Sequence, residues 1–534
     1  MYDHQEIAEI TRGNKARQGD IAARLSELAS TFASNVAAAT ADFSKPIEHE
    51  AELAGMSAQA KQRAQRKAEE QGLQGFLLTL DSPSYHRAIA SLDDRVLRKS
   101  LYEAYYTRAS DRGPRAGRFD NTPVLNEVLE LRLELALSRG FKNYAELALH
   151  DGIVTDPDEV ERRLLWEHRG TRQRAQAELD LLWAFAKKKG VPRGFSVWDL
   201  PYYAAWLIRE ELGVDEELLN AHFGFADALK GALTVASERL GLHVMALAPE
   251  SSAERGRAAY RVANVGGRIW GVLDFDAFGS PVSSENGVFD LDAPDDGVPV
   301  VRVQCGIEAP LPGEPIQLKH TDIRTLFRRT GHALFLLLTR TGSHSAKASP
   351  SATLGGEVAG RFFERFASHF DTLQSFARHR ETGHPLGHAQ FEQLVRRNNV
   401  HRELDASQAL ELFLFDLRVH RDHAPRGKST QLRAQVLDTF TQIRREQSVL
   451  PPSYWTRFAN ICAPIFAGDR AARLWQDDWA ERMGSALYAA LESSGFSNQV
   501  TRQQRDSFWA VGDLGIRTRI ERALGQLPAF GPAT

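Results

Sequence analysis

The sequence predicts a mostly α protein with two helical lobes and one small β-sheet near residues 258–304. Two observations lead to this prediction. The chain has 534 residues, which is more than one compact hydrophobic core usually serves. Apolar residues also recur at three- and four-residue spacings over most of the chain, whereas glycine-broken β-branched runs are confined to one stretch.

The first part of the chain reads as successive amphipathic helices. From Ile21 to about Gly190 the sequence is rich in Ala, Leu, Glu, Arg and Gln, and Ile21, Leu25 and Leu28 illustrate the helical spacing. Prolines and glycines at positions 46, 83, 113, 114 and 140 mark natural helix ends or turns. We therefore predict an N-terminal helical lobe over residues 1–150, a second domain over 151–527 and a disordered tail over 528–534.

The pattern of residue types changes in the middle of the chain. Short β-branched runs broken by glycine occur at residues 261–265, 267–275 and 298–303, and they predict a small sheet. The polar, acidic stretch from Ser280 to Gly297 is expected to be an exposed loop. Helical patterning returns after Thr321 and continues to about Leu527.

Composition excludes several classes of protein. A formal net charge of -3 gives no sign of a nucleic-acid binder. Only Cys305 and Cys462 are present, which rules out a disulfide framework and a four-cysteine zinc site. The N-terminus lacks a basic segment followed by an apolar core, and the apolar run from Ala333 to Leu338 is too short to span a bilayer. We expect a cytoplasmic protein with no membrane or nucleic-acid partner.

The most informative motif lies on the helix expected after Thr321. The segment from Phe327 to Ala333 has the outline of a zinc-peptidase helix, in which H-E-x-x-H supplies two metal ligands and a general base. Only His332 remains of these. Arg328 stands at the first ligand position and Arg329 at the base position, and a guanidinium has no lone pair to offer a metal.

The residues around this motif resemble the thimet oligopeptidase and oligopeptidase A family of zinc metallopeptidases, whose motif reads L-F-H-E-F-G-H-x-L. The resemblance extends from about Ile21 to about Gly495, and it begins partway into the family sequence, so we expect a long N-terminal helical segment to be missing. It implies a two-lobed helical fold around a central channel, with residues 151–527 as the metallopeptidase-like domain. Further segments that resemble the family are Glu52–Met56, Gly75–Asp81, Tyr105–Asp111, Leu412–Arg418 and Ile465–Gly468.

The resemblance also locates the remaining site positions. A family motif like E-L-P-S-Q-F-x-E aligns Glu357 with the third zinc ligand and Glu364 with an outer carboxylate, provided that the preceding loop is one residue shorter. Without that gap, Val358 would face the site. The resemblance therefore implies two remnant ligand positions, His332 and Glu357.

A second family segment, like F-A-G-G-Y-A-A-G-Y-Y-S-Y-L-W, carries tyrosines that stabilise the oxyanion. Here Arg470, Leu474, Trp475 and Asp477 occupy the four tyrosine positions, and Pro464 replaces a histidine expected near the oxyanion. Ligand, base and oxyanion donors are thus all altered, so we expect no zinc-dependent proteolysis, no catalytic residues of the family type and no cofactor.

Two interpretations of the arginines stay open. Arg328 and Arg329 either fill the old zinc space and pair with Glu357 and Glu364, or join Arg470 and Arg473 in an anion pocket for a carboxylate or phosphate.

Other candidates for a functional site are weaker. His379, His384 and His388 lie in or beside a glycine- and proline-bearing turn, where a second metal site is not expected, and Trp455, Trp475 and Trp479 are expected to be core or groove walls.

The sequence favours an inactive homologue of the oligopeptidases that binds a peptide or protein partner in its channel. One alternative is a repurposed, metal-free enzyme that acts on a small anionic or peptide-derived substrate in the old cleft. The other is a residually active zinc endopeptidase, with zinc held with help from Glu364 or Asp477. The residues expected to contact a ligand are Arg328, Arg329, His332, Glu357, Glu364, Arg470, Arg473, Trp475 and Asp477.

Overall fold

The computed structural model describes residues 4–191, 194–247, 249–279, 288–291, 297–339, 350–423, 429–509 and 514–528. Within these ranges the protein is mostly helical, as predicted, and it divides into two compact units. Unit 1 contains residues 1–211 and 400–475, and unit 2 contains residues 212–399 and 476–534. The boundary predicted near residue 150 lies inside unit 1, because helices from the later part of the chain complete the core of that unit.

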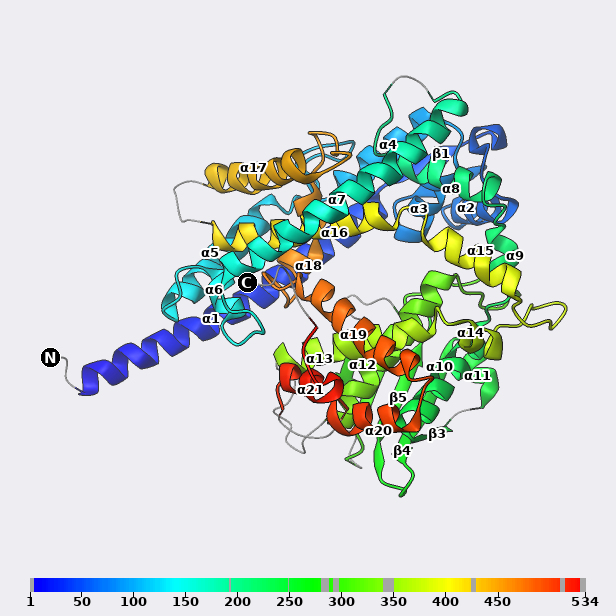
Figure 1. Ribbon diagram of the computed structural model, residues 1–534. Coiled ribbons are helices and arrows are strands. Elements are labelled where there is room, and N and C mark those ends of the chain that lie inside the picture. Colours follow the sequence, from blue (N-terminus) through cyan, green and yellow to red (C-terminus); the bar gives the residue numbers. More distant parts are fainter. Residues whose placement is uncertain are drawn as a thin grey trace. The chain divides into compact units, whose positions relative to one another are not determined.

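Unit 1 is helical apart from one pair of short strands (Figure 1). Its two longest helices in the middle of the chain, α7 and α16, pack along each other, and α1 packs on α5. The elements of unit 1 are α1 (His4–Asp42), β1 (Ser44–Ile47), η1 (Glu50–Leu53), α2 (Ala58–Glu70), β2 (Phe76–Thr79), α3 (Ser82–Ser91), α4 (Arg95–Tyr106), α5 (Thr122–Ser138), α6 (Tyr144–Leu149), α7 (Pro157–Lys188), α8 (Leu200–Glu210), α16 (Arg402–Arg421), α17 (Ser429–Gln447), η3 (Phe458–Ile461) and α18 (Ala463–Phe466).

The local sequence explains where these helices begin. Asp94 accepts hydrogen bonds from the backbone amides of Val96 and Leu97 at the start of α4, and Asp156 caps α7, whose first residue is a proline. The antiparallel pair β1 and β2, with Ser44 opposite Thr79, was not predicted. Four-residue strands carry too little periodicity to be distinguished from loops in a sequence rich in helices.

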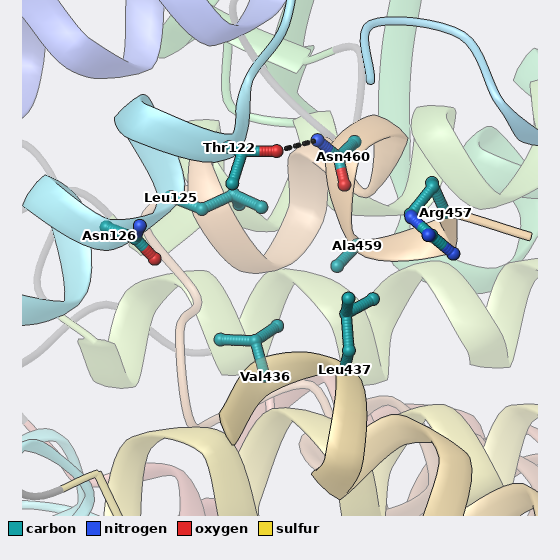
Figure 2. A pocket seen from close by; sticks show the side chains of 8 residues that line it. All are labelled: Thr122, Leu125, Asn126, Val436, Leu437, Arg457, Ala459 and Asn460. Atoms are coloured by element: carbon teal, nitrogen blue, oxygen red, sulfur yellow. Dashed lines mark hydrogen bonds between the residues drawn. The ribbon is translucent and has the colours of Figure 1, made fainter. Parts of the chain in front are cut away.

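Distant segments of unit 1 meet at Asn460 (Figure 2). Its side-chain amide donates to Thr122 Oγ1 at 3.1 Å and to the Ala109 carbonyl at 3.1 Å, while Asn121 donates to the Asn460 carbonyl at 3.0 Å. The small pocket beside these residues, lined also by Leu125 and Val436, has a volume of about 10 Å³, so it holds one water at most. This is a structural junction and not a ligand site.

Unit 2 combines helices with a five-stranded sheet. The strand order is β3-β4-β5-β7-β6, in which β5 and β7 are parallel and the other neighbours antiparallel. The elements of unit 2 are α9 (Glu216–Asn220), α10 (Phe225–Leu240), β3 (Leu242–Ala246), α11 (Glu250–Glu254), β4 (Arg257–Asn264), β5 (Ile269–Asp276), β6 (Val288–Leu291), β7 (Val300–Gln304), α12 (His320–Thr339), α13 (Pro350–Phe366), α14 (Phe370–Phe376), α15 (His388–Asn398), α19 (Gln476–Ser493), α20 (Asn498–Ser507) and α21 (Ile516–Leu524).

The predicted sheet is confirmed, and β3 extends it beyond the expected start. Of the loop predicted over residues 280–297, residues 280–287 and 292–296 lie outside the described residues, and residues 288–291 form β6. In the predicted tail, residues 529–534 also lie outside them. Cys305 and Cys462 are both buried, and neither forms a disulfide. Among the described helices, none has the length and apolar character needed to cross a bilayer.

Candidate functional site

Helices α12 and α13 carry the degenerate motif and pack closely in unit 2, and α19 packs on α13 (Figure 1). Glycines make the close approach possible. A Cβ atom added at Gly356 would lie within 3.0 Å of the His332 ring, and one added at Gly360 would lie 2.7 Å from the Arg328 carbonyl oxygen. Real Cβ atoms do not make such contacts, so both positions require glycine for this helix spacing.

His332 and Glu357 face each other across these two helices. The His332 Nδ1 atom lies 3.3 Å from Glu357 Oε1, and their side chains are 8% and 5% exposed. Val358, the neighbouring residue, is fully buried. Glu357, and not Val358, is therefore the residue of this pair that lies beside His332.

Arg329 points toward the sheet. Its Nη1 atom donates to the carbonyl oxygen of Gln304 at the end of β7, and the residue is buried. Burial lowers the pKa of Arg329, and the neighbouring charge of Arg328 lowers the pKa further. The family's base position thus holds a buried cation anchored to a strand, and it supplies no proton acceptor.

Arg328 is half-buried and lies against α13. A Cβ atom at Gly360 would meet the Arg328 Cγ atom at 2.9 Å, so the arginine stem runs directly over that glycine. Within the part of the chain that the structure describes, the Arg328 guanidinium has no hydrogen bond and no ion pair. It still acts at longer range, because its charge helps to lower the pKa of Glu364.

Glu364 is held by two arginines that the sequence analysis did not single out. Glu364 Oε1 lies 2.5 Å from Arg324, and Glu364 Oε2 lies 3.0 Å from Arg361. Burial pushes the pKa of Glu364 upward, but Arg361, Arg324 and Arg328 outweigh burial, so this pKa lies below its ordinary value. Glu364 is therefore ionised at neutral pH, and each of its carboxylate oxygens pairs with an arginine.

Arg361 extends this network to a third helix. Its guanidinium lies 3.1 Å from Glu481 on α19, and Glu481 also pairs with Arg365 at 2.6 Å. The pKa of Arg361 is raised: burial opposes its charge, but the fields of Glu364, Glu481, Asp477 and Glu357 prevail. In the family motif a glutamine stands where Arg361 stands here, and that substitution was the signal that could have identified this residue.

The predicted pairing of the motif arginines is therefore wrong. Neither Arg328 nor Arg329 forms an ion pair with Glu357 or Glu364 in the described residues; Glu364 pairs with Arg324 and Arg361, and Glu357 lies against His332. The physical reason is the spacing of the residues. Arg361 and Glu364 are three residues apart on α13, so their side chains meet without distortion. Arg329 instead donates a hydrogen bond to a backbone carbonyl of the sheet.

Most residues of the altered tyrosine segment belong to unit 1. Asp416 on α16 holds this segment, because it accepts the backbone amides of Ala472 at 2.8 Å and Leu474 at 3.1 Å. Arg470, Leu474 and Trp475 are buried, Pro464 is half-buried in α18, and Arg473 donates to the Asp469 carbonyl. Asp477 belongs to unit 2, on the first turn of α19.

His379 and His384 line one pocket of unit 2, together with His222. His379 and His384 lie in a turn closed by backbone pairing of Arg378 with Pro385, as expected, and His388 stacks on Phe370 with ring centroids 3.7 Å apart. Trp475 and Trp479 are buried in the two cores, which agrees with a structural role. In the described ranges no three His, Cys, Asp or Glu side chains converge as a metal site would require.

Comparison with known proteins identifies the family. The family model described as peptidase family M3 matches residues 88–515. The chain belongs to peptidase family M3. Among its curated relatives in the M3 family, oligopeptidase A of Salmonella typhimurium is 32% identical over 515 residues, covering 92% of this chain and 73% of that protein. Oligopeptidase A of Escherichia coli is 31% identical over 513 residues, with the same two shares.

A solved structure shows the same fold at lower sequence similarity. The crystal structure of a Chlamydophila abortus protein assigned as a peptidase matches with a TM-score of 0.52 and 13% identity, covering 96% of this chain and 71% of that one. This likeness concerns the fold alone. The helical architecture around the small sheet is therefore that of M3 and M3-like peptidases, as the sequence predicted.

The residues of this M3 chain do not fit the zinc ion that an H-E-x-x-H helix would hold. A zinc tripod needs three donors that converge on one point. Here His332 Nδ1 and Glu357 Oε1 lie 3.3 Å apart, Arg328 stands at the remaining ligand position, and Arg361 adds a half-buried cation whose pKa is raised in part by Glu357. Guanidinium groups repel a dication strongly at short range in a buried site.

Proposed function

We propose that this chain is a non-hydrolytic member of the M3 family that binds a peptide, or an unfolded segment of a protein partner. The observation that carries the proposal is the set of cations beside the two remnant ligand positions. His332 Nδ1 and Glu357 Oε1 lie 3.3 Å apart, on helices whose neighbouring cations are Arg328, Arg329 and Arg361. Cations at these positions disfavour a bound dication.

The chemistry of hydrolysis supports the same proposal. Peptide hydrolysis by this family type requires an acceptor for the proton of the attacking water. Arg329 at that position is a donor at every accessible pH, even though burial lowers its pKa. The segment that supplies oxyanion donors in the family offers Arg470, Leu474, Trp475 and Asp477 instead of tyrosines.

Peptide binding is the part of the family's activity that these substitutions leave possible. The relatives at 31–32% identity are named oligopeptidases, and the match to them covers 92% of this chain. Recognition of an extended peptide depends on main-chain hydrogen bonds and side-chain pockets and needs no metal. The partner is therefore expected to be a peptide, and the central channel stays a prediction.

The experiment combines metal analysis with a cleavage assay. Protein purified without chelators is expected to contain zinc far below one ion per chain and to leave a library of quenched fluorescent peptides uncut, while oligopeptidase A of Salmonella typhimurium cuts them under the same conditions. Binding of the same peptides is measured by fluorescence anisotropy. Stoichiometric zinc, together with cleavage that a chelator abolishes, would contradict the proposal and establish a residual zinc peptidase.

A second candidate function is metal-free chemistry at the same place. The contact of His332 with Glu357 favours it, because a carboxylate that orients a histidine is a common acid–base arrangement. Both side chains are nearly buried, however, and a substrate would have to displace the packing around Gly356 to reach them. If turnover of any peptide-derived compound is detected, it should be lost in His332→Ala and insensitive to chelators.

A further inference from the structure

The arginines on the α12–α13 face differ in how their charges are balanced. Arg324 pairs with Glu364 at 2.5 Å, and Arg365 pairs with Glu481 at 2.6 Å. Arg361 lies between those two carboxylates, and Arg329 is tied to the Gln304 carbonyl. Among these side chains, as far as the structure describes them, Arg328 alone has neither a hydrogen-bond acceptor nor an ion pair.

The nearby carboxylates are not available to Arg328. Glu364 already accepts from two arginines, and Glu481 is shared by Arg361 and Arg365. Glu357 lies against His332. A half-buried guanidinium that gives up part of its hydration without a partner is in an unfavourable state, which an incoming anion would relieve.

The first part of the Arg328 side chain packs along α13. Its stem passes over Gly360, where an added Cβ atom would collide with Arg328 Cγ at 2.9 Å. A glycine at this position therefore makes room for the arginine along α13. The planar guanidinium fork then matches the two oxygens of a carboxylate.

We propose that Arg328 is the recognition residue for a carboxylate of the bound peptide. This inference rests on the proposed function and names the ligand chemistry of the same site. The carboxylate belongs either to the C-terminus of the peptide or to an Asp or Glu side chain, and both present the planar pair of oxygens that a guanidinium binds in bidentate fashion. A residue that ligated zinc in a peptidase ancestor would thus serve as an anion receptor.

The test uses the full-length protein and three fluorescein-labelled octapeptides of Gly, Ala and Ser. The first has a free C-terminal carboxylate, the second a C-terminal amide, and the third a C-terminal amide with one central glutamate. The wild-type protein is expected to bind at least one carboxylate-bearing peptide about tenfold more tightly than the neutral amide, which corresponds to about 1.4 kcal/mol. Preference for the first or the third peptide identifies the source of the carboxylate.

Variants locate the effect. Arg328→Gln should bind all three peptides with the affinity of the neutral amide, and Arg328→Lys should keep only part of the preference, because it retains the charge without the fork. Arg380→Gln is the matched control, since it removes the same charge from an exposed arginine on the 378–387 turn and should change nothing. Circular dichroism confirms that each variant is folded.

The outcomes separate this inference from the proposed function. If the wild-type protein binds the neutral amide as tightly as the carboxylate peptides, peptide binding stands and the role of Arg328 is refuted. The same holds if Arg328→Gln keeps the tenfold preference. If no peptide binds, the proposed function fails, and the inference fails with it.

Discussion

The guanidinium of Arg361 lies 3.0 Å from the carboxylate of Glu364, and Glu481 lies 3.1 Å from the same nitrogen. One half-buried cation on α13 therefore joins two carboxylates that belong to different helices. In a zinc peptidase the metal supplies the positive charge around which the motif helices are ordered. In this chain the arginine supplies a positive charge that needs no metal.

Removal of that cation should destabilise unit 2. Arg361→Gln leaves Glu364, whose side chain is 10% exposed, without its second partner. We expect a loss of about 3 kcal/mol in the free energy of unfolding at pH 7, measured by urea denaturation, because breaking a buried pair leaves an uncompensated charge. Arg365→Gln is the control, with an expected loss below about 1 kcal/mol, since Arg365 and Glu481 are both more than a third exposed. Equal losses in the two variants would show that Arg361 has no special role.

The close approach of α12 and α13 predicts a second effect on stability. Gly356→Ala should cost about 1–3 kcal/mol, because the added Cβ would overlap the His332 ring. The same substitution in a His332→Ala background should cost much less, because the ring is gone. A double-mutant cycle by thermal and urea unfolding measures this coupling. Additive costs would mean that Gly356 and His332 do not touch.

The sequence predicted those features of the site that follow from local patterning or from a motif. The helix that carries Arg328 to His332 starts at His320, two residues before the start expected after Thr321, with Asp322 in its first turn. The one-residue gap in the resemblance pointed to Glu357, whose carboxylate lies 3.3 Å from His332. Such features can be predicted because helical periodicity and motif spacing are properties of neighbouring residues.

The features that were missed depend on residues far apart in the chain. The partner of Arg361 on α19, Glu481, is more than a hundred residues away, and no local pattern links the two. The anchoring of Arg329 to Gln304 likewise requires knowing that β7 ends beside α12. The composition of unit 1 has the same character, because residues 400–475 join residues 1–211 in one compact unit.

Asp478 predicts a pH dependence of stability. Its pKa is raised to about 6, because partial burial of the carboxyl group and the charge of Glu481 outweigh the opposing charge of Arg361, and Asp477 adds to the repulsion. An acid whose pKa is higher in the folded than in the unfolded protein opposes folding once it ionises, so stability is lost as the pH rises from about 4 to about 6 and stays lower above that. Asp478→Asn should match the wild-type protein near pH 4 and exceed its stability at pH 8 by about 1–2 kcal/mol. Urea unfolding at both values tests this, and an equal difference at the two pH values would contradict it.

Restoration of a metal site should require three substitutions. Arg328→His with Arg329→Glu returns the H-E-x-x-H sequence, but Arg361 would remain, and its pKa shows that it feels the charge of Glu357. We therefore expect the double variant to bind zinc weakly and the triple variant with Arg361→Gln to bind it at least tenfold more tightly, because removing the cation lowers the electrostatic cost of placing a dication beside Glu357.

Zinc affinity is measured by competition with a chromophoric chelator. Arg361→Gln alone is the control, because it lacks the Arg328→His and Arg329→Glu substitutions. Peptide cleavage by the triple variant should stay far below that of oligopeptidase A, since Arg470, Leu474, Trp475 and Asp477 still occupy the tyrosine positions. If the double variant already binds zinc as tightly as the triple variant, Arg361 does not oppose the metal. If the triple variant cleaves peptides at the rate of the active relative, the missing tyrosines matter less than the ligands and the base.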